Sequence, residues 1–469
     1  MHSRDLLTAA AGHAADFLET LPDGRVEAEV LDADELRARL AVPLPDGPTD
    51  PRTVLDELVG AATPGLVRSQ SPRYFGYVIG GTLPAALAAD VVVAGWDQNA
   101  GGYSVSPAAS VVEEVAGGWL LDLLGLPAGA SFGLTTGCQQ AHVTCLAAAR
   151  NAVLGRVGWD AEVGGLQGAP HVRLVVSEER HVTIDRAARI LGFGTAALIP
   201  VAVDATGRID PTALGAVLAA GDGPTIVCAQ AGDVNTGAVD PLAEIVDLAH
   251  AAGAWVHIDG AFGLWAAASP ERRHLLDGYA GADSWATDGH KWLNVPHDCG
   301  LAFVSDPEPH RNAMIVSAAY LRGTREGERD GSRWVPDFSR RGRGLAVYAA
   351  LRSLGREGIA EMVERCCACA RRFAEVLGAD EGIEILNDVV LNQVLVRFAD
   401  DDATTDAVVA AVQAEGTCWM SPTTWRGRRA MRISVCNWAT TISDVDRSCA
   451  AILRIARRRA AAPAGPPPV

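Results

Sequence analysis

The sequence predicts an α/β protein built on a mostly parallel β-sheet, and two observations carry that prediction. Between residues 130 and 310, short apolar runs that are typical of strands alternate with segments of helical spacing. In the helical segment 241–252, apolar residues recur every three or four positions. Such alternation is typical of a parallel sheet that helices cover, and ligands of these sheets bind at the carboxyl ends of the strands.

The strands of this region are predicted from apolar, β-branched runs. They lie at 174–177, 225–230, 255–258 and 301–304. We expect helices after the first two, around 186–191 and 241–252. From about residue 345 the pattern changes to a helix, strands at 389–398 and 431–435, and a final helix, which predicts a smaller α+β domain.

The predicted domain organisation follows from these changes of pattern. Residues 1–60 form an N-terminal helical arm of two short helices joined by a Pro/Gly segment. Residues 61–340 form the large domain and residues 341–460 the small C-terminal domain. The Pro-rich end, 461–469, is expected to be disordered.

Composition excludes several classes of protein. The net charge of −17 disfavours nucleic acid and anionic membranes as partners. The sequence contains no run of about twenty apolar residues, so no membrane span is predicted. The N-terminal residues lack a signal-peptide pattern. The ten cysteines are too few for a disulfide scaffold, so we expect a cytoplasmic protein with reduced thiols. The pair Cys366 and Cys369 lies in a helical stretch, and we expect helix packing there and no metal.

The predicted chemistry rests on an aspartate and a lysine. Asp259 ends a predicted buried strand, and Lys291 follows the short run 284–287. Alone, Asp259 would be a strand-end cap and Lys291 a surface residue. Together they match the needs of pyridoxal 5′-phosphate (PLP), whose aldehyde condenses with a lysine and whose ring nitrogen pairs with an aspartate.

A phosphate site is predicted upstream of this pair. The polar turn 134–142 opens a helix, and free N–H groups at a helix N-terminus suit a phosphate. His181 lies four residues after the strand 174–177, where it fits either a histidine stacked on the cofactor or a helix cap.

Several segments, in order, are similar to the group II PLP-dependent amino-acid decarboxylases, of the aromatic-amino-acid, glutamate and diaminobutyrate decarboxylase type. They include SPRYFGYVIGGTLPAALAAD from residue 71, VHIDGAFG from residue 256, DGHKWLNVPHDCG from residue 288 and SRRGRGLAVYAALRSLG from residue 339. The resemblance implies PLP fold type I, as in aspartate aminotransferase, and a homodimer with active sites at the interface.

The resemblance also implies roles for single residues. Lys291 would bind PLP as a Schiff base, Asp259 would pair with the ring nitrogen, and Ala261 and His181 would cover the two ring faces. The phosphate would meet Gly137, Cys138, Gln139 and His290. The substrate pocket would be lined by Tyr77, Val78, Ile79 and Thr82. Arg432, on a predicted strand, is a further candidate to meet a substrate carboxylate, or else forms a surface ion pair.

Three departures from the family pattern matter. The family's Gly-Thr-Thr turn near the cofactor reads Gly232-Asp233-Val234-Asn235-Thr236, and the added carboxylate could favour a cationic substrate. Asp288 and Gly289 stand where the family often has Asn-Pro before His-Lys. The predicted mobile loop 322–334 has no tyrosine, although family decarboxylases commonly use one to protonate the carbanion. Tyr320, just before the loop, and His181 are the candidates for that proton transfer.

The sequence thus predicts decarboxylation of an L-amino acid to an amine and CO₂, through a Lys291 aldimine and a quinonoid carbanion. The alternatives are an aldehyde synthase or an aldolase-type C–C lyase on the same scaffold, and a non-catalytic protein of the same fold. The substrate remains open, with aromatic or aliphatic amino acids favoured over acidic ones.

Overall fold

The computed structural model describes residues 3–316, 325 and 327–460. Its internal contacts divide the chain into two compact units. The larger unit contains Gly80–Arg371 and Asn387–Val394, and the smaller contains Met1–Ile79, Arg372–Leu386 and Leu395–Val469. The predicted boundaries at residues 60, 340 and 460 stay predictions, and the tail 461–469 lies outside the described residues.

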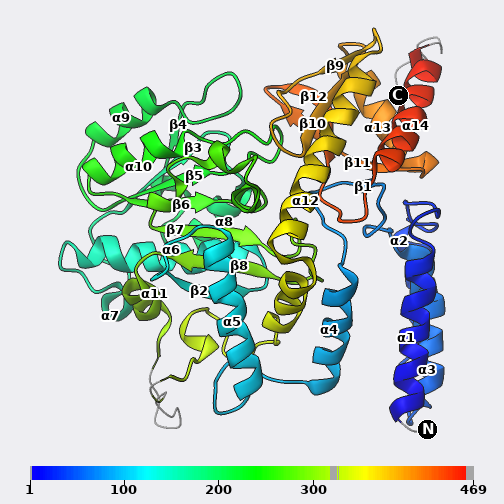
Figure 1. Cartoon of the computed structure of the whole chain (residues 1–469), viewed down its shortest axis with the longest axis horizontal. Coiled ribbons are helices and arrows are strands. Elements are labelled where there is room, and N and C mark those ends of the chain that lie inside the picture. The colour runs from blue at the N-terminus through cyan, green and yellow to red at the C-terminus, as the bar shows by residue number, and fades with distance from the viewer. Residues whose placement is uncertain (1–2, 317–324, 326, 461–469) are drawn as a thin grey trace. The chain divides into compact units, whose positions relative to one another are not determined.

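The larger unit is built on a seven-stranded sheet of order β2-β8-β7-β6-β5-β3-β4 (Figure 1). Strands β3 to β7 pair in parallel, and β8 runs antiparallel to both β7 and β2. The bounds are β2 (Ser131–Thr135), β3 (Arg173–Ser177), β4 (Leu198–Val201), β5 (Thr225–Gln230), β6 (Trp255–Asp259), β7 (Ser284–Asp288) and β8 (Gly300–Val304).

Helices cover this sheet, and the chief core lies beneath α6 (Cys138–Gly155). Twelve residues of α6 are buried, because the helix is alanine-rich and packs closely against the strands. The other helices are α4 (Pro84–Trp96), α5 (Pro107–Leu123), α7 (Ala161–Gly164), α8 (Val182–Ile190), α9 (Pro211–Ala219), α10 (Leu242–Ala251) and α11 (Pro307–Met314). The long α12 (Gly344–Gly378) contributes residues to both units and is kinked at Gly355, whose φ is 60°.

The smaller unit contains a five-stranded sheet of order β1-β11-β12-β10-β9. The strands are β1 (Tyr74–Phe75), β9 (Ile383–Ile385), β10 (Gln393–Phe398), β11 (Trp419–Trp425) and β12 (Arg428–Ser434). Helix α13 (Asp402–Glu415) packs on β11 and β12 and against α14 (Ile442–Ala460). The N-terminal segment holds three helices, α1 (Ser3–Glu19), α2 (Ala33–Leu40) and α3 (Pro51–Ala62), so the prediction of two was wrong.

The four strands predicted in the larger unit are confirmed. Strands β1, β2, β4, β9 and β11 were missed because their runs are short or polar, and β7 was noted only as the short run 284–287. Cys366 and Cys369 lie buried on α12, as the prediction of helix packing requires. Among the described residues, no helix is both long and apolar enough to cross a membrane.

Candidate active site

The carboxyl ends of β6 and β7 bring two aspartates into one region of the larger unit. The two strands pair in parallel, with Asp259 opposite Ala286, and Asp288 ends β7 two residues later. The backbone N–H of Asp288 donates to the carbonyl of Ala261, just beyond β6, at 2.9 Å. Lys291 follows one helical turn after Asp288, so the strand ends position the whole group.

Lys291 is paired with Asp288. Its Nζ lies 3.1 Å from Asp288 Oδ2, and its side chain is 19% exposed. Burial lowers the pKa of Lys291, but the charge of Asp288, with smaller contributions from Cys138 and Asp259, outweighs burial and raises it above its ordinary value. The lysine is therefore an ammonium group at neutral pH while Asp288 faces it.

The N-terminus of α6 lies against the same carboxylate. The backbone N–H of Cys138, the first residue of α6, donates to Asp288 Oδ1 at 2.5 Å. His290 Nε2 lies 3.6 Å from that oxygen, and its Nδ1 accepts the backbone N–H of Cys299 at 3.2 Å. Burial lowers the pKa of His290 to about 4, so the neutral ring carries its proton on Nε2, pointing toward Asp288.

Gly137 is where this turn needs a glycine. A Cβ at Gly137 would lie 3.3 Å from His290 Cε1 and 3.6 Å from Asp288 Oδ1. The backbone of Gly300 approaches from β8, since a Cβ there would lie 2.3 Å from the carbonyl carbon of Gly137. The turn therefore presents its backbone, without side chains, to the space in front of α6.

Asp259 is a buried carboxylate with donors on both oxygens. Oδ1 accepts the backbone N–H of Ala261 at 3.1 Å, and Oδ2 lies 3.4 Å from His142 Nε2. Burial raises the pKa of Asp259, but His142, and then the charges of His181 and Lys291, outweigh burial and hold it below its usual range. Asp259 is therefore ionised, and His181 and Lys291 lie near enough to stabilise that charge.

Two further predicted residues meet through Thr183. His181 is the N-cap of α8, and its Nδ1 lies 2.9 Å from Thr183 Oγ1. Gln139 Nε2 donates to the Thr183 carbonyl at 3.3 Å. The beginnings of α6 and α8 are thus joined, and they bring Gln139 and His181 to the same region of the unit.

The Gly80-Gly81 pair packs on the segment that carries Lys291. A Cβ at Gly80 would lie 2.0 Å from the Lys291 carbonyl oxygen. The backbone N–H of Gly81 donates to Asn294 Oδ1 at 2.7 Å. Thr82 follows, half-buried, so it lies beside the segment that carries Lys291.

The other predicted substrate residues belong to the smaller unit. Tyr77 and Val78 have φ values of 53° and 57°, a strained backbone for residues other than glycine. Ile79 is half-buried, and Arg432 lies on β12 opposite Ser421. Their proposed contact with a substrate stays a prediction. Tyr320 lies outside the described residues.

The loop 322–334 is anchored at its described end by Arg329. The guanidinium carbon lies 4.1 Å from the centre of the Phe132 ring and 4.7 Å from the centre of the Trp334 ring. A guanidine nitrogen also donates to the Phe132 carbonyl. Burial lowers the pKa of Arg329 to about 10, and the two rings stabilise the remaining charge.

Asp233 has a structural role. Its Oδ1 accepts the backbone N–H groups of Asn235 and Thr236, at 2.9 and 2.8 Å, and closes its own turn. Since the residue is only 2% exposed, it offers a cationic substrate little surface.

Sequence reasoning missed two features of the site. His142 and His257 both lie behind Asp259; they stand in the segments 134–142 and 256–263, but neither was assigned a role. Lys291 is the only lysine in the sequence, and all the other residues in the count of 40 lysines and arginines are arginines. A lone lysine kept in a chain that otherwise uses arginine was a signal that the sequence offered directly.

A metal ion fits this site poorly. Cys138, His142 and Asp259 place ligand atoms within 4.8 Å of one another. However, burial, with the nearby charges of Asp288 and Asp259, raises the pKa of the Cys138 thiol well above its ordinary value. Since a metal binds the thiolate, this cysteine is a weak ligand.

The same residues fit PLP well. The N–H groups at the start of α6 and the Nε2–H of His290 are donors for a phosphate, Lys291 supplies an amine, and Asp259 supplies an ionised carboxylate. The charge of Asp288, at the start of α6, opposes a phosphate there.

Comparison with known proteins gives a consistent result. Residues 34–399 match the model of the "Pyridoxal-dependent decarboxylase conserved domain". Tryptophan decarboxylase 1 of Oryza sativa subsp. japonica is 29% identical over 435 residues, which cover 86% of this chain and 83% of that protein.

Two solved structures show the fold. The structure of Oryza sativa TDC with PLP and tryptamine has a TM-score of 0.90 at 24% identity, covering 97% of each chain. The structure of Rhodiola rosea 4-hydroxyphenylacetaldehyde synthase has a TM-score of 0.87 at 24% identity, covering 98% of this chain and 99% of that one. These likenesses confirm the predicted fold class.

Proposed function

The chain belongs to the family of pyridoxal-dependent decarboxylases, and we propose that it converts an aromatic L-amino acid to the amine and CO₂. The observation that carries this proposal is the joint placement of Lys291 and ionised Asp259 beyond adjacent strand ends. Membership confirms the predicted family, the predicted class of PLP-dependent carboxy-lyase and PLP as the cofactor.

The bound cofactor supplies an electron-withdrawing ring that accepts the electron pair left behind when the carboxylate departs as CO₂. The chain would hold it by four kinds of contact. Lys291 would bind it covalently through Nζ, and Asp259 would keep its ring nitrogen protonated. His290 and the N–H groups of Gly137, Cys138 and Gln139 would bind the phosphate, while His181 and Ala261 would cover the ring faces.

Binding of the cofactor must separate Lys291 from Asp288. The ammonium group of Lys291 has to lose a proton before its nitrogen can bond to carbon. Asp288 Oδ2 lies within hydrogen-bond distance of that nitrogen, at 3.1 Å.

Two residues compete for the step that returns a proton to the substrate carbon. His181 is held by Thr183 at the start of α8, and its charge reaches Asp259. Tyr320 precedes the loop 322–334. We propose His181 as the donor, because its contact with Thr183 fixes its position in the larger unit.

The aromatic substrate is supported by the relatives. Tryptophan decarboxylase 1 is named for an aromatic amino acid, and this chain covers most of that protein's length. Tyr77, Val78, Ile79, Thr82 and Arg432 remain the residues proposed to contact the substrate.

The test is mass spectrometry of products after the PLP-loaded protein meets a pool of L-amino acids in air. We expect the amine of tryptophan, tyrosine or phenylalanine, lighter than its parent by CO₂. Lys291→Ala is the control, since it should form none. Consumption of no amino acid by a protein that holds PLP would overturn the proposal.

A second candidate function is oxidative conversion of the amino acid to an aldehyde. The observation that favours it is the loop 322–334, which has no tyrosine to protonate the carbanion. If that proton arrives slowly, dioxygen can react first. An aldehyde with ammonia and hydrogen peroxide, formed in place of the amine, would establish this alternative.

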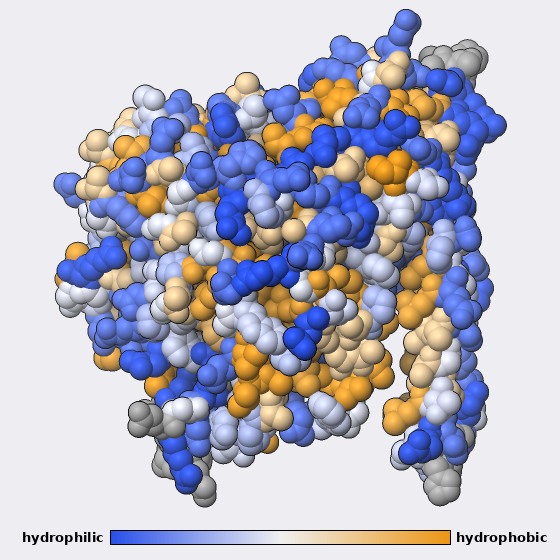
Figure 2. Space-filling view, viewed as in Figure 1, coloured by the Kyte–Doolittle hydropathy of each residue, from blue (hydrophilic) through white to orange (hydrophobic). Residues whose placement is uncertain are grey.

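We also propose a cytoplasmic homodimer. Helices α1, α2 and α3 have no buried residue within the chain. They expose apolar side chains, as Figure 2 shows in orange, with Leu7 64%, Val54 49% and Leu58 55% exposed. A second copy could cover that surface. The ten free cysteines suit a reducing compartment. Light scattering during size-exclusion chromatography would decide between monomer and dimer.

A further inference from the structure

A chain of polar contacts leads from Asp259 into the interior of the larger unit. His142 Nε2 lies 3.4 Å from Asp259 Oδ2, and His142 Nδ1 lies 2.9 Å from His257 Nε2. His257 Nδ1 lies 3.0 Å from Ser284 Oγ, which also accepts the indole N–H of Trp255 at 2.9 Å. All these side chains are buried, so solvent offers them no other partner.

When each histidine ring carries one proton, the two end groups, Trp255 and Asp259, determine which partner donates in each hydrogen bond between them. An indole N–H can only donate, and an ionised carboxylate can only accept. If His142 carries one proton, on the Nε2 that faces Asp259, its Nδ1 accepts, and His257 must donate from Nε2. His257 then accepts at Nδ1 the hydroxyl proton of Ser284, whose oxygen accepts from Trp255. In this arrangement every N–H and O–H donor of the hydrogen-bond chain is used.

The opposite direction is less favourable. It would start at the thiol of Cys138, whose Sγ lies 3.4 Å from His142 Nε2. His142 would then turn a lone pair toward the Asp259 carboxylate, which would be left without a side-chain donor on Oδ2. A buried charge that loses a donor is costly. Burial also lowers the pKa of His257 to about 3, which agrees with a neutral ring.

We propose that His142, oriented by His257 and Ser284, is a positioning residue that holds the Asp259 carboxylate ionised and fixed toward the cofactor's ring nitrogen. This inference rests on the proposed function for the identity of the cofactor. A carboxylate without that donor would more readily take the ring proton for itself, and the ring would lose its power to withdraw electrons.

Nitrogen NMR can show the direction of these hydrogen bonds. The full-length protein is labelled with ¹⁵N-histidine and measured before and after PLP loading. We expect the resonances that disappear in His142→Gln and His257→Gln to have the shifts of rings protonated on Nε2. Protonation of either ring on Nδ1 would overturn the proposal, because the chain would then point away from Asp259.

Variants separate positioning from packing. His142→Leu fills the space without a donor, whereas His142→Gln places an amide N–H near the position of Nε2. The matched control is His310→Leu, because His310 is equally buried and makes two contacts of 2.8 Å, to Ser131 Oγ and the Trp334 carbonyl, away from Asp259.

The expected readout concerns the cofactor and not the rate. The dissociation constant for PLP should rise about tenfold or more in His142→Leu, equivalent to ~1.4 kcal/mol, and stay near the parent value in His142→Gln and His310→Leu. With ¹⁵N-labelled PLP, the ring nitrogen should lose its proton at lower pH in His142→Leu alone. If His142→Leu and His310→Leu had the same dissociation constant for PLP and the same ring-nitrogen titration, His142 would only contribute packing, and the proposal would be refuted.

The two proposals fail in different ways. If the parent protein binds no PLP, the proposed function fails, while the histidine protonation pattern can still be measured. If the parent binds PLP and decarboxylates but His142 is protonated on Nδ1, only this inference fails.

Discussion

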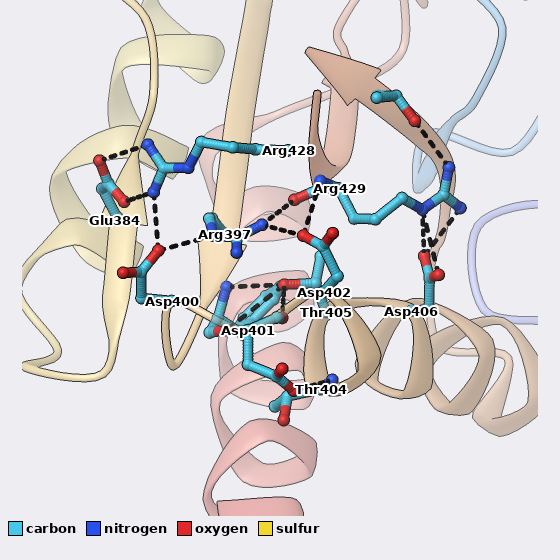
Figure 3. Close-up of polar contacts among 12 residues, drawn as sticks. Glu384, Arg397, Asp400, Asp401, Asp402, Thr404, Thr405, Asp406, Arg428 and Arg429 are labelled. Atoms are coloured by element: carbon cyan, nitrogen blue, oxygen red, sulfur yellow. Dashed lines mark hydrogen bonds and ion pairs between the residues drawn. The ribbon is translucent and has the colours of Figure 1, made fainter. Parts of the chain in front are cut away.

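Two polar clusters of this protein pair carboxylates with cationic groups, one around a buried carboxylate and the other around carboxylates that are largely exposed to solvent. In the larger unit, Asp259 is 5% exposed and depends on two donors and nearby cationic groups. In the smaller unit, three arginines meet four acidic residues in an extended ion-pair network (Figure 3). Its members are Arg397, Arg428, Arg429, Glu384, Asp400, Asp402 and Asp406.

The difference lies in how replaceable each partner is. Asp400 is 80% exposed and Asp406 48%, so water can take the place of an arginine. Around Asp259 no such replacement exists, and each lost donor leaves a buried charge unsatisfied. We therefore expect single substitutions to matter around Asp259, and substitutions of the exposed carboxylates Asp400 and Asp406 to have little effect.

The largest effect on stability is expected at the most deeply buried ion pair. Arg340 and Glu113 have side chains 0% and 3% exposed, with Nη1 and Oε2 3.0 Å apart. Arg340→Met should lower the free energy of unfolding by about 3–5 kcal/mol, because it leaves a buried carboxylate alone. Chemical denaturation measures this. The double variant Arg340→Met/Glu113→Leu should recover much of the loss, and a double variant as unstable as the single one would contradict the account.

Asp259→Asn tests the buried cluster at the site itself. It keeps the shape but removes the charge that would protonate the ring, so kcat should fall by roughly 10²–10³-fold. Asp240→Asn is the matched control, since Asp240 is a buried carboxylate that accepts two backbone N–H groups in the same unit. Equal loss of PLP-dependent activity per folded molecule in both variants would contradict a special role for Asp259.

Buried histidines should make stability depend on pH. Burial lowers the pKa of both His257 and His310 to about 3. Below pH 6.5 the unfolded chain gains protons that the folded chain does not, so stability is lost as pH falls toward 3. Each histidine should contribute a slope of about 1.4 kcal/mol per pH unit in that window. His310→Leu should reduce the slope of unfolding free energy between pH 6 and 4, and an unchanged slope would exclude this cause.

Asp288→Asn should speed the loading of PLP. Without the Asp288 charge the pKa of Lys291 falls, and the reactive neutral amine increases about tenfold for each unit of that fall. Stopped-flow absorbance at pH 7 measures the loading rate. Asp233→Asn is the control, because that carboxylate bonds its own turn. Slower loading in Asp288→Asn than in the control would show that Asp288 assists the phosphate.

The smallest effect is expected in the exposed cluster. Asp406→Ala breaks the 2.8 Å pair with Arg429, and the unfolding free energy should change by less than about 1 kcal/mol. Part of that change should vanish in 1 M salt, since salt screens exposed charges. Denaturation at low and high salt measures it. A loss as large as that of Arg340→Met would break the comparison between the two clusters.

The sequence predicted the cofactor, but it did not predict which residues pack behind the side chains proposed to hold it. Lys291 and Asp259 could be singled out from the sequence, because Asp259 ends a recognisable strand and Lys291 follows a short run within a motif. His142 was not, because its partner His257 lies 115 positions away and only the packing of α6 on β6 brings them together. Asp288 was noted as a departure, but its bonds to Cys138 and Lys291 depend on where α6 begins.

The fold followed the same rule. Strands with continuous apolar runs, such as β5 and β6, were predictable, since both faces of each are buried. Strands β2 and β11 contain glycine, serine, threonine and proline, and they form because neighbouring strands complete their hydrogen bonds. Residues 387–394 belong to the larger unit, although the segments on either side of them belong to the smaller unit. No feature of the sequence around these residues predicts that assignment.

The central claim, that Lys291 binds the cofactor, is tested most directly by reducing the PLP-loaded protein with borohydride and mapping the product by mass spectrometry. Because Lys291 is the only lysine in the sequence, we expect one adduct per chain, on the peptide that contains it, and none in Lys291→Arg. An unmodified Lys291 in a protein that decarboxylates with PLP, or an equal adduct in Lys291→Arg, would contradict the account.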